Sequence, residues 1–254
     1  MQSKTIYRIK RYSIVNKPFL KGAKDGLPIC LGYVSVSFVF GMMCVESGLP
    51  AWVAALISMT NLTSAGQFAG LSLILTGAPL VELAITTFVI NLRYMLMSLS
   101  LSQKVDAKMS TLTRALLSFG NTDEVFAVCM QQKGPVTTPY MTGLVICIYI
   151  GWALGTILGA TVTSLLPEMV RSAMGIAIYG MFIAIIIPPA RKLRPVLYTV
   201  LLAAVISSIF YYTPVLNLLS RGWVIILCAV GVSAFMAWKF PVKQESSEEV
   251  VNDA

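Results

Sequence analysis

The chain has 254 residues, of which 57% are hydrophobic and only 12% are charged, and its mean hydropathy is +0.79. A soluble domain carries about a quarter charged residues and cannot conceal this much apolar area, so the composition excludes an ordinary water-soluble fold. Lys and Arg number 19 against 11 Asp and Glu, which gives a net charge of +8. In a membrane protein such an excess of basic residues reports on orientation.

The residue types that most enzymes need are missing from the sequence or stand alone. It contains no His, the commonest metal ligand and general base. Its five Cys lie in or beside apolar runs without a CxxC pair, which is typical of apolar filling and not of a disulfide framework or a metal site. No nucleotide-binding or zinc-protease motif occurs in it. We therefore expect no enzyme, no catalytic residue, no metal and no cofactor.

Residues 1–24 form a basic segment ahead of the first apolar run. It holds seven of the 19 basic residues, namely Lys4, Arg8, Lys10, Arg11, Lys17, Lys21 and Lys24. Because basic residues next to membrane spans stay on the cytoplasmic side, we predict a cytoplasmic amphipathic tail here. A nucleic-acid partner is not expected, since no recognition module accompanies the tail.

Seven apolar runs follow, and several reach the ~18 residues of a spanning helix. They cover residues 27–44, 51–76, 79–102, 140–166, 173–188, 196–212 and 223–238. Residues 104–133 are polar and amphipathic, and residues 243–254 are polar, acidic and typical of disorder. The sequence predicts an all-α, polytopic transmembrane helix bundle, with a transport domain over residues 25–242 between the two tails.

The placement of charge indicates how many of these runs cross the bilayer. Basic clusters after the fifth and seventh runs place both sites in the cytoplasm, and counting back places residues 104–133 there too. With the N-terminus also inside, residues 46–104 must cross a net odd number of times. The second run is the weaker span, because its residues 61–67 are Asn-Leu-Thr-Ser-Ala-Gly-Gln. We predict about six full spans plus one broken or re-entrant segment at 51–76; the alternative is an ordinary span whose small polar residues pack on a neighbour.

Transporters place substrate sites at breaks of this kind. Uncharged hydrogen-bonding side chains gather near the predicted break, and a helix N-terminus beyond Gly66 offers backbone N–H groups to a carboxylate. Apolar side chains at similar depth suit a small zwitterion with a hydrophobic side chain. The candidate substrate-binding residues are Asn61, Thr63, Gly66, Gln67, Phe68, Asn91 and Arg93.

Charged residues inside apolar runs are unfavourable in lipid, by ~3 kcal/mol for a central Arg. Arg93 lies deep in the third run and needs an anion or carbonyls beside it, or a route to the interface. Glu82 lies near the start of the same run, where we expect it to face water. Asp123 and Glu124 follow Thr122 in a pattern that fits N-capping of a short helix. Alternatively, one of them counters Arg93 or carries a coupling proton.

Small residues recur at helical spacing in the fourth apolar run. Gly151, Gly155 and Gly159 form two consecutive GxxxG steps. In membranes this pattern is typical of close helix packing, and we expect a packing face there.

Several short motifs resemble one known family in the same order along the chain. They are Gly26-Leu27-Pro28, Phe38-Val39-Phe40-Gly41, Ser64-Ala65-Gly66-Gln67-Phe68-Ala69, Asn91-Leu92-Arg93-Tyr94-Met95-Leu96, Asn121-Thr122-Asp123-Glu124-Val125-Phe126 and Trp152-Ala153-Leu154-Gly155-Thr156. Over about residues 20–240 the sequence resembles the AzlC family, the large subunit of bacterial branched-chain amino-acid exporters. The resemblance implies a separately encoded, AzlD-like small membrane subunit as partner. Family members often have His where this chain has Tyr94, so a proton-relay role at that position is not expected here.

Together these features predict a secondary transporter that exports branched-chain, small hydrophobic amino acids across the bacterial inner (cytoplasmic) membrane. It would be a multi-pass protein in the lipid bilayer with both termini in the cytoplasm. A channel-like or structural subunit of a membrane complex is the alternative. An intramembrane enzyme is less favoured, because Asp123-Glu124 lacks basic or metal-binding partners in the sequence.

Overall fold

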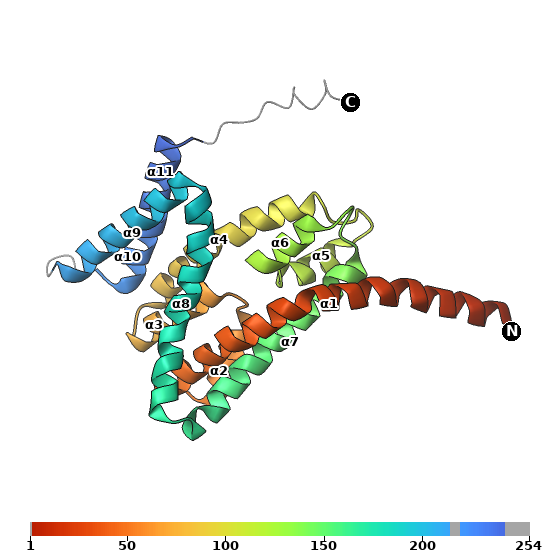
Figure 1. The fold of residues 1–254 in the computed structure, drawn as a ribbon, viewed down its shortest axis with the longest axis horizontal. Helices are drawn as coiled ribbons and strands as arrows, with labels where there is room; N and C mark the ends of the chain where they lie inside the picture. The colour runs from red at the N-terminus through yellow and green to blue at the C-terminus, as the bar shows by residue number, and fades with distance from the viewer. Residues whose placement is uncertain (1, 214–218, 242–254) are drawn as a thin grey trace. The chain divides into compact units, whose positions relative to one another are not determined.

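The computed structural model describes residues 2–213 and 219–241. Within those ranges the secondary structure is helical, and the β-pairing found there is one isolated bridge between Val105 and Val136. The predicted all-α, polytopic bundle is confirmed (Figure 1). The C-terminal tail predicted at 243–254 lies outside the described residues.

Five helical stretches of the described residues are long and apolar enough to cross a bilayer. They are Lys17–Glu46 of α1 (Gln2–Glu46), α4 (Leu80–Ser102), α7 (Thr138–Val162) with its 3-10 extension η1 (Thr163–Leu165), α9 (Arg194–Tyr212), and the continuous α10 (Arg221–Leu227), η3 (Cys228–Val232) and α11 (Ser233–Lys239). The 25 residues of α8 (Glu168–Lys192) give about 37 Å of helix, which also exceeds the ~30 Å hydrocarbon core. With α8 included, the spans agree with the six that were predicted.

The chain divides into two compact units, Met1–Gly180 and Met181–Ala254. In the second unit, α9 packs against η3 and α11, and the rings of Tyr198 and Phe240 stack with their centroids 6.0 Å apart. Every candidate site residue named from the sequence lies in the first unit.

The first helix begins earlier than the apolar run indicates. The first apolar run begins at residue 27, whereas α1 is helical from Gln2 and contains Pro18 and Pro28 in its interior. Each proline removes a backbone N–H donor from the helix. The contact of α1 with α7 already begins at Phe19, so tertiary packing maintains the helix through Pro28.

The most extensive helix contact in the first unit is the packing of α1 on α7, which run parallel (Figure 1). A Cβ built on each of four α7 glycines would lie 2.0–2.8 Å from a main-chain carbonyl oxygen of α1. The facing pairs, each a glycine of α7 and a carbonyl of α1, are Gly143 with Phe19, Gly151 with Cys30, Gly155 with Val34 and Gly159 with Phe38. Because both sets of numbers rise together, the two helices point the same way across the bilayer. The chain between them must therefore cross back a net odd number of times.

The predicted break in the second apolar run is confirmed. α2 (Ala51–Thr60) and α3 (Ser64–Leu75) are separated by three non-helical residues, 61–63. With 12 residues, α3 is about 18 Å long, too short to span. Leu71 of α3 shares one buried cluster with Ala54 of α2 and with Phe40 and Cys44 near the end of α1. The chain thus enters and returns on the same side, which makes α2–α3 a re-entrant hairpin, called the first hairpin below.

A second hairpin comes from the opposite side, in a region whose sequence indicates only a polar, amphipathic segment. α5 (Thr111–Ser118) and α6 (Asp123–Gln131) pack in a buried cluster with Leu101, Met141 and Ile148. The Val105–Val136 bridge closes its base. Its turn is pressed on α7, because a Cβ on Gly120 would lie 2.4 Å from a methyl carbon of Val145. Of the helices between α1 and α7, only α4 then spans the bilayer. One such crossing is what the parallel directions of α1 and α7 require.

Candidate transport site between two helix N-termini

The tips of the two hairpins meet at the middle of the long helices. Tyr149 of α7 donates a hydrogen bond to the carbonyl oxygen of Met59 at the first tip (3.1 Å), and the hydroxyl of Tyr33 in α1 lies 2.7 Å from Oγ1 of Thr122 at the second. Tyr33, Asn91 and Trp152 each lie within two residues of the midpoint of their span. Since a span is centred on the hydrocarbon core, both tips lie near the bilayer midplane.

Each tip presents the N-terminus of a helix, and each is capped by a threonine. Oγ1 of Thr63 accepts a hydrogen bond from the Gly66 N–H (3.4 Å), and Oγ1 of Thr122 accepts one from the Val125 N–H (3.5 Å). Unpaired N–H groups give a helix N-terminus a partial positive charge. In α6 this charge is offset by Asp123 and Glu124 in the first turn, whereas α3 has no acidic residue there. One tip therefore favours an anion, and the other carries carboxylates.

Two adjacent residues of α4 connect these N-termini. Arg93 forms an ion pair with Asp123, with 2.9 Å between Nη2 and Oδ2. The same Nη2 lies 3.3 Å from the hydroxyl of Tyr94, which in turn donates to Oγ1 of Thr63 (3.2 Å). The side chains of Arg93 and Asp123 are 45% and 43% exposed in the lone chain. Tyr94, which we had noted only as a departure from the family pattern, links the two tips.

A second cluster joins α1, α6 and α7 beside the ion pair. The Tyr33 hydroxyl hydrogen-bonds the Glu124 carboxylate as well as Thr122. The ring of Tyr33 meets that of Trp152 edge to face, with centroids 5.0 Å apart. Tyr33 and Trp152 were not predicted as site residues, because each stands in an apolar run where an aromatic residue is ordinary. Only long-range packing brings them to Glu124.

Several buried polar atoms around the tips have no hydrogen-bond partner within the described protein. Gln67 in α3 is only 1% exposed, and both its amide oxygen and its amide nitrogen are unpartnered. The same holds for Oδ1 of Asn91, Oδ1 of Asn121 and Nε1 of Trp152. A buried polar group without a partner costs about 1–3 kcal/mol, so such groups point to a bound polar molecule.

The structure brings most of the predicted residues together but not all of them. A Cβ on Gly66 would lie 3.3 Å from Oδ1 of Asn91, so the lack of a side chain there lets α4 approach the first turn of α3. Asn61 ends α2 at the first tip. Phe68 instead packs edge to face on Phe40 in the cluster at the far end of α1. Glu82, expected to face water, is instead buried in the first turn of α4, with 4% of its surface exposed.

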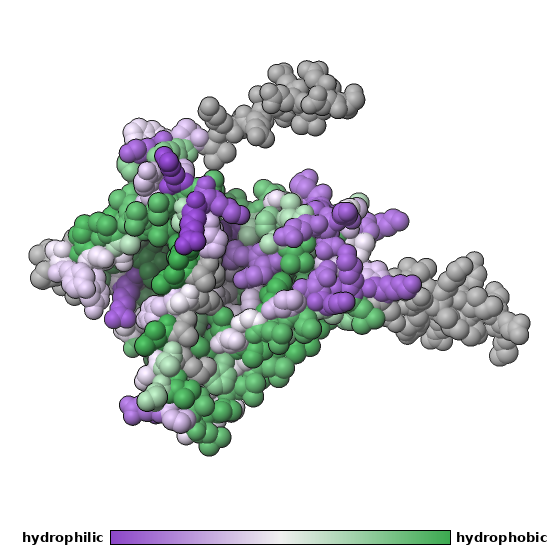
Figure 2. Space-filling view, viewed as in Figure 1, coloured by the Kyte–Doolittle hydropathy of each residue, from purple (hydrophilic) through white to green (hydrophobic). Residues whose placement is uncertain are grey.

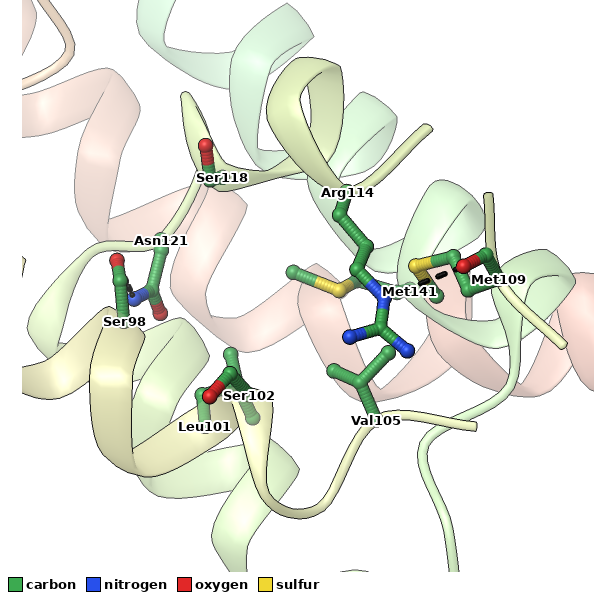
Figure 3. Close-up of a pocket in the computed structure, with 9 residues that line it drawn as sticks. All are labelled: Ser98, Leu101, Ser102, Val105, Met109, Arg114, Ser118, Asn121 and Met141. Atoms are coloured by element: carbon green, nitrogen blue, oxygen red, sulfur yellow. Dashed lines mark hydrogen bonds between the residues drawn. The ribbon is translucent and has the colours of Figure 1, made fainter. Parts of the chain in front are cut away.

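A cavity continues from the second tip toward the base of the second hairpin (Figure 3). At one end, Asn121 Nδ2 donates to Ser98 Oγ (2.8 Å). At the other, the guanidinium of Arg114 points into the cavity and donates to the carbonyl oxygens of Asp106 and Met109, each at 3.2 Å.

The described residues form a polytopic membrane protein with long apolar helices and two opposed re-entrant hairpins. Helix N-termini near the midplane are an arrangement that transporters use for substrate sites. A family model described as AzlC protein matches residues 28–166, and the chain belongs to this AzlC family. The matched region contains both hairpins, α4 and α7. Family membership and the membrane-protein relatives support a role in membrane transport.

The relatives come from bacteria and an archaeon. The chain is 25% identical to the inner membrane protein YgaZ of Escherichia coli K12 over 202 residues, which cover 77% of this chain and 82% of that protein. It is 30% identical to an uncharacterized membrane protein of Archaeoglobus fulgidus over 172 residues, 67% of this chain and 75% of that one. An uncharacterized membrane protein of Helicobacter pylori J99 is 29% identical over 153 residues, 58% of this chain and 66% of that one. No solved structure matches the chain.

Proposed function

We propose that the protein is a secondary transporter that exports branched-chain, small hydrophobic amino acids across the bacterial inner membrane. The observation that carries the proposal is the charge asymmetry of the two tips. The N-terminus of α3 has no acidic residue in its first turn, whereas that of α6 carries Asp123 and Glu124. A zwitterion matches this arrangement, since its carboxylate suits the first and its ammonium the second.

In this proposal the amino acid enters between Arg93 and Asp123. Its carboxylate accepts hydrogen bonds from the first-turn N–H groups of α3 and from Arg93, and its ammonium group donates to Asp123. One internal ion pair is thereby exchanged for two, so neither charge is left unpaired at mid-depth. Gln67, with its unpartnered buried amide, supplies further hydrogen bonds. The apolar side chain lies against Leu62, which is buried in the first tip.

The energy source in this proposal is an ion gradient, because the sequence has no nucleotide-binding motif. Asp123 and Glu124 are the carboxylates at the site that can take up a coupling proton. Arg93 holds the first and Tyr33 the second. Protonation of Asp123 weakens its pair with Arg93 and frees the guanidinium for substrate, which couples the two events.

Orientation follows from the lysines at the base of the second hairpin. Lys17 and Lys21 of α1 lie there with Lys133 in the turn before α7, and Lys104 donates to the carbonyl oxygen of Met130 nearby. The positive-inside rule places this end, with the N-terminus, in the cytoplasm. With six crossings the C-terminus is cytoplasmic as well, and the cavity beside Arg114 lies on the cytoplasmic side of the two tips.

A small AzlD-like membrane subunit is part of the proposal through the family resemblance. The lone chain leaves large apolar side chains of α4 exposed, among them Leu80, Phe88, Leu96 and Leu99. Lipid covers such a surface, and so does a partner helix.

Counterflow of labelled leucine in proteoliposomes tests the proposal, with and without the small subunit. We expect saturable exchange that needs unlabelled leucine on the opposite side. An unsaturable leak would instead favour a channel, and no flux even with the subunit present would favour a structural role. The variant Gln67→Leu removes the buried amide and should weaken the exchange. Gln103→Leu, at the exposed residue that follows α4, is its matched control.

A further inference from the structure

A second cavity, open to the surface, lies at the base of the second hairpin, away from the transport site. It is formed by residues 17–21 of α1, the turn before α7 and the start of α7. Lys17, Lys21 and Lys133 line it with Gln132, Thr137 and Tyr140, and none of its nine lining residues is acidic. The cavity therefore concentrates positive charge.

The nearest carboxylate is already engaged on the side of the helix pair. Asp25 accepts hydrogen bonds from the Tyr140 hydroxyl (2.8 Å) and the Gln132 amide nitrogen (3.5 Å). Gln132 in turn accepts from Lys21 Nζ (2.7 Å), which also lies 5.4 Å from the centre of the Tyr140 ring. This network fixes the position of Lys21 in the cavity wall.

The cavity lies at the depth of phospholipid headgroups. Tyr33 marks the midplane on α1, and Lys21 is 12 residues away, or about 18 Å at 1.5 Å per residue. On α7, Tyr140 lies the same 12 residues from Trp152. The hydrocarbon core ends about 15 Å from the midplane and the headgroup layer about 22 Å from it, so both helices place the cavity inside that layer.

Exposed apolar side chains lead from the lysines toward the hydrocarbon. Leu20, Leu27 and Leu31 of α1 are 63%, 52% and 63% exposed, and their spacing places them on one helix face with Lys17 and Lys24. Figure 2 shows the same transition, from hydrophilic residues where α1 meets the second hairpin to hydrophobic ones along α1 and α7. A ligand with an anionic head and acyl chains fits this surface, whereas a soluble anion uses only the cavity.

We propose that this cavity binds the headgroup phosphate of an anionic phospholipid, with an acyl chain along the exposed leucines of α1. Lys17, Lys21 and Lys133 contact the phosphate. The lipid fastens the second hairpin, through Lys133, to α1. This inference does not depend on which substrate the protein transports.

Native mass spectrometry of the full-length protein, released from micelles that contain equal amounts of phosphatidylglycerol and phosphatidylcholine, tests the site. We expect retained phosphatidylglycerol in excess, and about a fivefold weaker retention for each lysine removed in Lys21→Gln and Lys133→Gln. Lys108→Gln, an exposed lysine of the same membrane end outside the cavity, is the control and should leave retention unchanged. Thermal unfolding of each variant establishes that it is folded, and Lys133, in a turn, gives a second variant if Lys21→Gln is unstable.

Equal retention of the two lipids would overturn the proposal, as would an equal loss in Lys108→Gln. A third arm uses millimolar inorganic phosphate. If phosphate displaces the lipid and binds the lipid-free protein with the same lysine dependence, the site is one for soluble anions and the lipid assignment is wrong.

Discussion

Arg93 of α4 and Asp123 of α6 form a 2.9 Å ion pair at the level where two re-entrant hairpins meet. The pair lies between a helix N-terminus that carries acids and one that does not. Its partial exposure distinguishes it from a structural ion pair buried in a core. A zwitterion can separate the two charges and satisfy both, which makes the pair the centre of the proposed transport site.

Exchanging the two charges tests this role of the pair. Arg93→Asp or Asp123→Arg alone leaves like charges together at mid-depth, so we expect poor folding and no transport. The double variant Arg93→Asp/Asp123→Arg restores the attraction and should recover folded protein. It should not recover leucine counterflow, because the carboxylate now faces the substrate carboxylate near α3. Normal counterflow by the double variant would mean that the pair has only a structural role.

Gln67→Leu should lower substrate affinity without lowering thermal stability, so it separates binding from folding. The amide of Gln67 is buried without a partner, so an apolar side chain of similar volume should leave thermal stability equal or higher. Loss of its hydrogen bonds to a charged substrate, ~1.5–3 kcal/mol, should lower substrate affinity about 10-fold or more. Melting temperature in detergent and the half-saturating leucine concentration in counterflow measure the two effects. Unchanged affinity would remove Gln67 from the site.

Gly159→Ala should destabilise the protein strongly. Its new Cβ would lie 2.0 Å from the carbonyl oxygen of Phe38, so α1 must move away from α7. We expect a loss of about 1–3 kcal/mol in the free energy of unfolding. Gly32→Ala on α1 is the matched control, because a Cβ there has no atom within 4 Å and alanine favours the helix by ~0.5–1 kcal/mol. Equal melting temperatures for the two variants would contradict the parallel α1–α7 contact.

Single cysteines in a cysteine-free background test the first hairpin. Ser47, before α2, and Thr76, after α3, should react with an impermeant thiol reagent from the same side of the membrane. Gln103, after α4, should react from the other side. All three positions are exposed. Labelling of Thr76→Cys and Ser47→Cys from opposite sides would mean that residues 51–76 span the bilayer.

The first hairpin was predictable and the second was not, for physical reasons. The positions of the basic residues require that one apolar run does not span the bilayer. The polar residues 61–67 indicate where that run breaks, and the break is observed between α2 and α3. The helices α5 and α6 have only eight and nine residues with lysines on both sides, and from sequence such a region resembles a cytoplasmic loop. Tyr33 and Trp152 join the site only through packing between helices distant in sequence.

The central claim is that an amino acid binds at the N-terminus of α3, and substrate protection tests it most directly. In membranes, Ala65→Cys in a cysteine-free background places a thiol in the first turn of α3, and Thr76→Cys places one at the opposite end of that helix. Leucine should slow thiol labelling at position 65 in a saturable way and leave position 76 unaffected. Labelling at 65 that is independent of leucine, in a variant that still exchanges leucine, would contradict the account.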